Sequence, residues 1–329
     1  MENEKINVKL FNKYSKLLMD VKKEVKKTVI GQEAIVDGFL RGLLANGHVL
    51  VEGIPGIAKT LLVRTLAKVT GCQFSRIQFT VDLLPTDIVG LQTYQEGKGF
   101  YTIKGPIFAN YVLADEINRA PPKTQSALLE AMQEKQATIG KETFPMMNPF
   151  FVMATQNPIE QEGTYRLPEA QVDRFIFKLL MPYPTMDEEQ LILNTNMTLR
   201  KFEDYDLKAV LNPQTILKMQ DFVKNIYLDK EIEKYIVRII DATRYPNKYK
   251  LKYAKYIDWG ASPRASIALF IGAKTQALLK GKQYVTPQHV KDVAYDVLRH
   301  RLLLTYEAEA EKITPDMVIK DILSRVPIP

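Results

Sequence analysis

The chain has 329 residues, 46% of them hydrophobic and 25% charged, with a net charge of +7. This length predicts two domains and this composition predicts a soluble globular protein, because no window approaches the ~20 apolar residues that a membrane span needs. Cys72 is the only cysteine and the three histidines are scattered, which excludes an internal disulfide and gives no zinc pattern. The lysine-rich start is not a signal peptide, so we expect a cytoplasmic protein.

The positive charge is concentrated between Asp241 and Arg301, where 12 Lys or Arg residues accompany 4 Asp or Glu residues. Within it, the segment 244–256 interleaves lysines with tyrosines. Such a segment can bind phosphates and stack on bases, or it can be a solvated loop whose tyrosines pack locally. No other nucleic-acid motif accompanies it, so the second interpretation is favoured and nucleic acid is not an expected partner.

The first half of the chain alternates helical patterns with short apolar runs, which predicts a parallel sheet with helices on both faces. A turn at Gly140 also predicts a hairpin over 137–148. The expected strands are 48–51, 111–114, 150–154 and 176–180, and the expected helices are 8–28, 32–46, 59–69 and 122–136. We therefore expect an α/β domain over residues 1–183.

After the two prolines at 182 and 184 the pattern is helical to the end. The Thr-Pro pairs at Thr286 and Thr314 are typical helix starts. The expected helices are 187–200, 214–228, 230–243, 263–280, 287–303 and 314–325. A helical second domain is therefore expected over residues 184–329.

A glycine-rich loop follows the first strand and opens a helix, as in phosphate-binding loops. Backbone N–H groups of such a loop point at a polyphosphate, the lysine reaches the β- and γ-phosphates, and the threonine hydroxyl binds Mg²⁺. The usual pattern has glycine before the lysine, and Ala58 stands there instead; an alanine accepts helical torsions, so we expect a mild departure. The loop comprises Gly53, Ile54, Pro55, Gly56, Ile57, Ala58, Lys59 and Thr60, with Leu61 following.

Asp115 and Glu116 end the second predicted strand, where carboxylates face the ligand crevice of a parallel sheet. Asp115 is expected to hold Mg²⁺ through water, and Glu116 to polarise the attacking water as a general base. An acidic cap on the following helix is the alternative. The phosphate loop upstream favours the catalytic interpretation.

Several long runs resemble the MoxR branch of the AAA+ ATPases, in the same order, between about Val29 and Arg301. The resemblance implies a P-loop AAA+ domain with a parallel sheet between helices, followed by a small all-helical lid domain. One departure is Arg166, where the family usually has proline. The matching runs are 79–87, 112–134, 154–160, 163–175 and 260–265.

The resemblance implies roles for three further polar residues. Asn157 matches the sensor-1 residue that orients the attacking water, although an Asn-Pro turn is also possible from the sequence. Arg174 matches the arginine finger that reaches a γ-phosphate bound by the neighbouring subunit; an ion pair with a nearby carboxylate is the alternative. Arg264 matches the sensor-2 arginine that contacts the γ-phosphate within one subunit, against the alternative of a surface arginine at a helix start.

The resemblance also implies that Ile30 and Gly31 pack around adenine. The hairpin over 137–148 and the segment 91–108 resemble insertions that line the pore or top face of a ring in this family.

The function implied is Mg²⁺-dependent ATP hydrolysis at subunit interfaces of a ring, a hexamer, that remodels or matures client proteins with a von Willebrand factor A-domain partner. ATP and Mg²⁺ are the implied cofactors. Three alternatives are the ATPase subunit of a metal chelatase, a nucleic-acid motor or loader, and a scaffold that binds ATP with little turnover. Intact Lys59, Glu116, Asn157 and Arg174 disfavour the scaffold.

Overall fold

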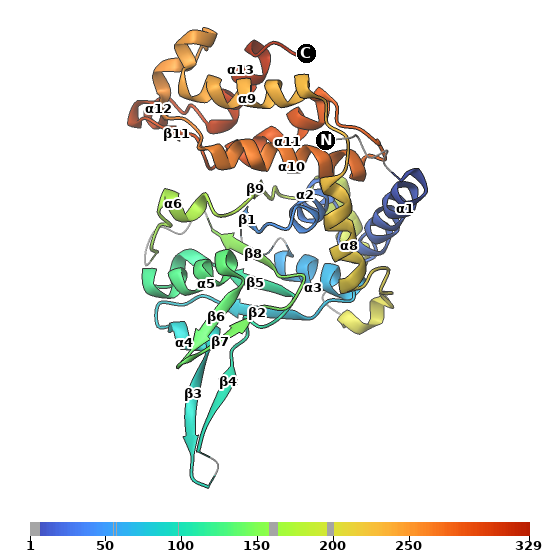
Figure 1. Cartoon of the computed structure of the whole chain (residues 1–329), viewed down its shortest axis with the longest axis vertical. Coiled ribbons are helices and arrows are strands. Elements are labelled where there is room, and N and C mark those ends of the chain that lie inside the picture. The colour runs from blue at the N-terminus through green and yellow to red at the C-terminus, as the bar shows by residue number, and fades with distance from the viewer. Residues whose placement is uncertain (1–6, 55, 57, 98, 158–163, 196–200) are drawn as a thin grey trace.

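The computed structural model describes residues 7–54, 56, 58–97, 99–157, 164–195 and 201–329. At its centre is a five-stranded sheet in the order β2-β5-β8-β1-β9 (Figure 1). All its strands are parallel, so their carboxyl ends lie along one edge, as predicted for this fold class. The strands are β1 (Val49–Glu52), β2 (Phe74–Gln78), β5 (Tyr111–Asp115), β8 (Phe151–Gln156) and β9 (Phe177–Leu180).

The edge strand β2 is absent from the prediction, which found the other four. Only Ile77 of its five residues is buried, and Ser75, Arg76 and Gln78 interrupt its apolar character. The continuous apolar run that marks an inner parallel strand is therefore missing. The strand pairs with β5 so that Gln78 lies beside Asp115, at the carboxyl edge of the sheet.

Helices cover both faces of the sheet, because successive residues of each strand point to opposite sides. On β5, Leu113 joins one apolar cluster, which includes α2 (Glu33–Leu44) and α3 (Lys59–Val69). Its neighbours in β5, Val112 and Ala114, join a second cluster with α5 (Pro122–Glu134) on the other face. Two short helices, α4 (Pro85–Val89) and α6 (Glu169–Val172), complete this half of the chain.

The two N-terminal helices differ from the prediction in extent and burial. Helix α1 (Val8–Val25) packs against α3 and ends three residues before residue 28, because a turn follows in which the Thr28 hydroxyl donates to the Val25 carbonyl. Helix α2 was predicted to be amphipathic, but it lies between the sheet and the C-terminal helices and is buried on nearly every side, Arg41 included.

Two hairpins extend from this half. The predicted hairpin is formed by β6 (Gln136–Ile139) and β7 (Glu142–Pro145). The segment 91–108 forms a longer hairpin of β3 (Gly90–Gln95) and β4 (Gly99–Lys104), which projects away from the body of the molecule (Figure 1).

The C-terminal part is helical except for a short antiparallel pair, β10 (Ile257–Trp259) with β11 (Leu303–Leu304), which the prediction of an all-helical domain did not contain. The predicted start at Thr314 is confirmed by its side chain, which accepts from the amide of Met317. No helix among the described residues is long and apolar enough to cross a membrane. The helices are α7 (Met186–Thr195), α8 (Pro213–Lys224), α9 (Lys230–Arg244), α10 (Pro263–Leu279), α11 (Pro287–Leu298), α12 (Tyr306–Ala310) and α13 (Pro315–Arg325).

The two halves of the chain share one apolar cluster, in which Phe39 and Phe177 of the first half lie with Leu269 and Val293 of the second. Buried polar contacts cross the same boundary. Arg41 of α2 donates to Gln276 of α10 and pairs with Asp296 of α11. The division at 183/184 remains a prediction about sequence organisation, because these contacts join the halves into one packed body.

The basic segment 244–256 makes local contacts. The side chains of Lys248 and Tyr249 both bond to Asp241, and those of Lys255 and Tyr256 both bond to Glu311. Two of its five basic side chains, Lys248 and Lys255, are therefore paired with carboxylates of the same part of the chain, and two of its tyrosines bond to the same carboxylates.

Candidate active site

The phosphate loop leaves the carboxyl end of β1, at the centre of the sheet edge. The amide of Gly53 donates to the carbonyl of Gln156 on β8 over 3.3 Å, which fixes the first residue of the loop. Helix α3 begins at Lys59, as predicted. The Nζ of Lys59 donates to the Gly53 carbonyl over 2.5 Å. The side chain of Lys59 therefore lies back along its own loop. Pro55 and Ile57 lie outside the described residues.

Ala58 corrects one expectation. Its backbone has φ 63° and ψ 29°, which is left-handed and not the right-handed helical conformation expected for an alanine there. An L-residue pays roughly 1–2 kcal/mol for this conformation, and glycine does not. Glu116 has a similar backbone, with φ 56° and ψ 50°. Left-handed residues other than glycine often cluster at functional sites.

A cavity of about 400 Å³ opens beside the loop, a size suited to a small-molecule ligand. It is lined on one side by Val29 and Ile30 and on another by Tyr183, with Gly56 and Ala58 at the loop. The structure thus brings the segment expected to contact adenine to the phosphate loop. Tyr183 was not predicted; it follows the last sheet strand, and only the adjacent prolines drew attention to this region.

Gly31 is required where it stands. Its φ is +73°, and a Cβ there would lie 2.3 Å from the carboxyl carbon of Glu188. This carboxylate accepts from the amide of Thr185 and so caps the start of α7. The glycine allows α7 to approach the segment before α2, which closes this side of the cavity.

The acidic pair lies at the end of β5, next to β8. The buried hydroxyl of Thr155 donates to Asp115 Oδ1 over 2.7 Å and accepts from the amide of Glu116 over 2.8 Å. One threonine therefore fixes both the Asp115 carboxylate and the turn that carries Glu116. Asn157 follows β8 at the same edge and is buried.

Strand β2, which was not predicted, and Arg119 supply further contacts to the acidic pair. Arg76 donates to Asp115 Oδ2 from two nitrogens, over 3.2 and 2.7 Å. Gln78 donates to Glu116 Oε2 over 2.9 Å, and Arg119 donates to the same oxygen over 3.0 Å. Both carboxylates are thus held by hydrogen-bond donors.

Lys59 experiences the acidic pair electrostatically. Burial lowers the pKa of Lys59, and the negative charges of Asp115 and Glu116 oppose that shift. The phosphate-loop ammonium and the two carboxylates therefore belong to one charged site. Its groups stand at or after the ends of β1 and β5, the two strands that flank β8 in the sheet.

The two predicted arginines lie elsewhere, in a second cavity of about 250 Å³ between the end of α5, the segment that joins α6 to β9, and the start of α10. Arg174 and Arg264 both line it, and neither lines the cavity at the phosphate loop. Asp173 Oδ2 accepts from Ser262 over 3.2 Å and pairs with Arg264 over 3.5 Å. These contacts place the start of α10 against the segment after α6, and Arg264 does not line the cavity beside the phosphate loop of its own chain.

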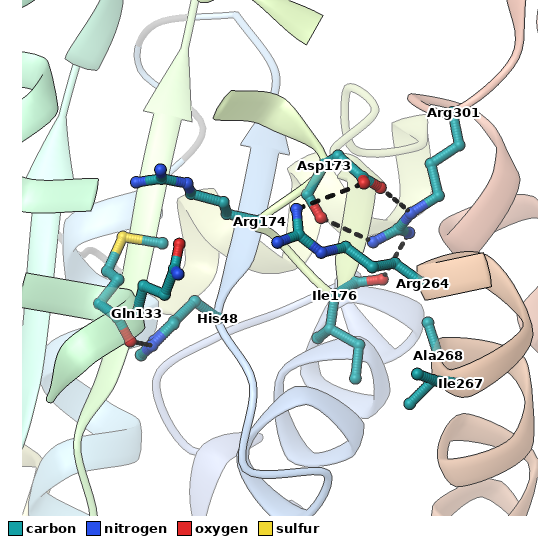
Figure 2. A pocket seen from close by; sticks show the side chains of 10 residues that line it. His48, Gln133, Asp173, Arg174, Ile176, Arg264, Ile267, Ala268 and Arg301 are labelled. Carbon is teal, nitrogen blue, oxygen red and sulfur yellow. Dashed lines mark hydrogen bonds and ion pairs between the residues drawn. The ribbon is translucent and has the colours of Figure 1, made fainter. Parts of the chain in front are cut away.

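Arg174 is exposed and is directed away from Asp173, as Figure 2 shows. The alternative considered from the sequence, an ion pair with Asp173 or Glu169, is not seen. Asp173 instead pairs with Arg264 and Arg301, and Glu169 lies 3.7 Å from the exposed Arg166.

Comparison with known proteins identifies the family of the chain. Residues 48–177 match the model of the ATPase family associated with various cellular activities (AAA), and residues 253–322 match the AAA lid domain. The chain is 50% identical to Chaperone MoxR1 of Mycobacterium tuberculosis over 309 residues, which are 93% of this chain and 81% of that protein.

Two further relatives align over nearly their whole length. The YeaC protein of Bacillus subtilis is 44% identical, over 95% of each chain. The crystal structure of a presumed ATPase from Cytophaga hutchinsonii superposes with a TM-score of 0.90 at 46% identity, over 97% of each chain.

Proposed function

The chain belongs to the MoxR family of AAA+ ATPases, and from this premise we propose that it hydrolyses Mg²⁺-ATP at interfaces between subunits of a ring. The family makes it a nucleotide-binding, chaperone-like ATPase. The observation that carries the interface proposal is the separation of two sets of residues. The phosphate loop lines one cavity, and Arg174 and Arg264 line another.

In this proposal the triphosphate lies in the loop from Gly53 to Thr60, Leu61 included. Successive amides of the loop and the positive end of α3 neutralise it, and Lys59 moves from the Gly53 carbonyl to the β- and γ-phosphates. The adenine lies in the 400 Å³ cavity against Ile30, which lines it, and beside Gly31, the next residue. The loop assignment comprises Gly53, Ile54, Pro55, Gly56, Ile57, Ala58, Lys59 and Thr60.

The residues present fit a magnesium ion. Thr60 offers a hydroxyl and Asp115 a carboxylate, and Mg²⁺ prefers such hard oxygen ligands and retains several waters. When bound, the ion neutralises charge on the β- and γ-phosphates. Thr155 and Arg76 orient the Asp115 carboxylate toward that task.

Glu116 acts as general base toward the attacking water, and Asn157 orients that water from the next strand. The left-handed turn at Glu116 and the donors Gln78 and Arg119 set where the carboxylate points before reaction. A positioned base contributes roughly 10²–10⁴ in rate.

Arg174 and Arg264 serve the γ-phosphate bound by a neighbouring subunit. The family resemblance implied that Arg264 acts on the nucleotide of its own subunit. Because Arg264 lines the same cavity as Arg174, we assign both guanidinium groups to one partner subunit instead. They stabilise charge that develops in the transition state, without movement of a lid within the chain.

The output of this cycle would be remodelling or maturation of a client protein by a hexameric ring in the cytoplasm, together with a von Willebrand factor A-domain partner. The family supports the chaperone-like character.

Phosphate release from Mg²⁺-ATP over a protein concentration series tests the interface proposal. The rate per subunit should rise with concentration, because assembly completes each site. Glu116→Gln should remain ~10²–10⁴-fold slower at every concentration. A rate per subunit that is flat down to concentrations at which the chain is monomeric would sink the interface proposal.

A further inference from the structure

Arg301, just after α11, is a buried arginine that the proposed mechanism does not use. Its side chain is 3% exposed, and Figure 2 shows it converging with Arg264 on Asp173. An arginine has five N–H donors and keeps its charge in proteins. Burial of such a group costs several kcal/mol unless its donors and its charge are satisfied.

All five donor positions of Arg301 are used. Nε pairs with Asp173 Oδ1, and the other two nitrogens each donate to two backbone carbonyls. The bonds run from Nε to Asp173 Oδ1 at 2.7 Å, from one terminal nitrogen to the carbonyls of Ile176 at 3.1 Å and Val297 at 2.7 Å, and from the other to those of Asp173 at 3.2 Å and Phe175 at 2.7 Å.

Four of these bonds reach the segment that contains Arg174, and two of the carbonyls belong to its immediate neighbours, Asp173 and Phe175. The guanidinium therefore fixes the backbone on both sides of Arg174. The side chain of Arg174 itself has no hydrogen bond or ion pair to the described part of the chain. Its direction depends on the backbone that carries it.

The same contact reaches Arg264. Asp173 uses Oδ1 for Arg301 and Oδ2 for Ser262 and Arg264. One buried guanidinium in the C-terminal half thus holds the carboxylate to which the second arginine is tied. Both proposed trans-acting arginines are therefore supported by Arg301.

We propose that Arg301 is a positioning residue for catalysis on the neighbouring subunit: it aims Arg174 directly, and Arg264 through Asp173, at the partner's nucleotide. This inference rests on the proposed function, in which those arginines act across the interface. Loss of Arg301 then damages the site of the adjacent subunit and leaves the nucleotide site of its own subunit intact.

Mixed assemblies separate these two effects. A donor subunit with Glu116→Gln keeps its arginines but cannot use its own nucleotide, and an acceptor subunit with Arg174→Ala has the reverse defect. Neither hydrolyses ATP alone, and a mixture regains activity where a donor faces an acceptor. Arg301→Gln is then added either to the donor or to the acceptor, and phosphate release is measured for each mixture.

We expect Arg301→Gln in the donor to lower the restored rate by about 10- to 10²-fold, the scale of a misplacement of about 1 Å in a catalytic group. In the acceptor it should leave the rate within about 2-fold, a margin far below that scale. A folding or assembly defect would lower both arms alike. Arg301→Lys, which keeps the charge but not the planar set of donors, should lie between the wild-type and Gln donors.

Arg299→Gln is the matched control. Arg299 is another largely buried arginine of the same turn; it bonds to Asp316, Asp296 and the Lys178 carbonyl, and none of these bonds reaches the segment 173–176. It should destabilise the chain without a difference between donor and acceptor arms. Equal effects of Arg301→Gln in both arms would overturn the positioning role. Failure of the parent pair to regain activity would overturn the interface proposal and this inference with it.

Discussion

The phosphate-loop side and the arginine side of the molecule are built in different ways. On the first, the functional groups stand at the ends of adjacent strands and contact one another, as Asp115 and Thr155 do. On the second, the exposed arginines are supported from beneath by a buried guanidinium from the far end of the chain. The first side is organised by the sheet, and the second by packing between the two halves of the chain.

This difference assigns separate tasks to the two sides. A strand edge can hold a ligand by local geometry alone, whereas exposed cations that act on another molecule need a rigid base. Substitutions on the two sides should therefore give different kinetic signatures.

The largest effect separates the two sides directly. Arg174→Ala should lower turnover ~10³–10⁵-fold and leave nucleotide binding unchanged, because Arg174 does not line its own nucleotide cavity. Lys59→Ala should instead weaken nucleotide binding by roughly 10- to 10²-fold, since a hydrogen bond from a charged group contributes ~1.5–3 kcal/mol. Titration with a fluorescent nucleotide and steady-state phosphate release measure the two quantities. Weaker nucleotide binding by Arg174→Ala would contradict the separation of the two sides, because Arg174 would then contribute to the nucleotide site of its own chain.

The second arginine should matter less. Arg264→Ala should lower turnover by roughly 10²–10³-fold, the loss on removal of one transition-state donor. Arg166→Ala is a matched control, because Arg166 is exposed and, among the described residues, its ion pair is with Glu169. Steady-state rates compare the pair, and equal rates for Arg264→Ala and the control would remove Arg264 from the proposed mechanism.

A smaller effect tests whether water is excluded from His48 on the arginine side. His48 lines that cavity, and burial lowers its pKa to about 4, with a minor contribution from Lys135. Between pH 6.5 and 4 the unfolded chain binds the proton and the folded chain does not. The free energy of unfolding therefore decreases as the pH is lowered through this range. The loss from His48 should be about 2 kcal/mol from pH 8 to pH 5.

Urea unfolding at the two pH values measures that difference. His48→Gln should be less stable at pH 8, because the bonds of His48 to Val152 and Met132 are disturbed, but should lose about 2 kcal/mol less than wild type on acidification. If His48→Gln loses as much stability as wild type between pH 8 and pH 5, then His48 is solvated.

The smallest effect lies on the phosphate-loop side. Ala58→Gly should raise the free energy of unfolding by up to about 1 kcal/mol, because glycine accepts the left-handed backbone, although its freedom in the unfolded chain offsets part of the gain. Thermal unfolding measures it. Destabilisation on this change would show that Ala58 is not left-handed in solution.

The phosphate-loop side could be predicted from the sequence because its motifs are contiguous. Gly53 to Thr60 and the pair Asp115-Glu116 each follow an apolar run that reads as a buried strand. Arg76 and Gln78 were missed because they lie on a half-exposed edge strand without such a run.

The arginine side could be predicted only in part. The roles of Arg174 and Arg264 came from the family resemblance, and both remain predictions. Arg301 counted merely as one of 12 basic residues in a charged stretch. A buried arginine and a surface arginine look alike in sequence, and its partner Asp173 is 128 positions away.

The packing of the two halves determines how the long hairpin of β3 and β4 would move when the subunit rotates. Because Arg41, Asp296 and the shared apolar cluster join the halves, a rotation of the subunit carries the whole body with it. Each strand of the hairpin has 6 residues and is therefore ~20 Å long, at ~3.4 Å per residue. A rotation of about 10° about the base of such an arm would sweep its tip through roughly 3–4 Å, about the length of one residue of an extended chain.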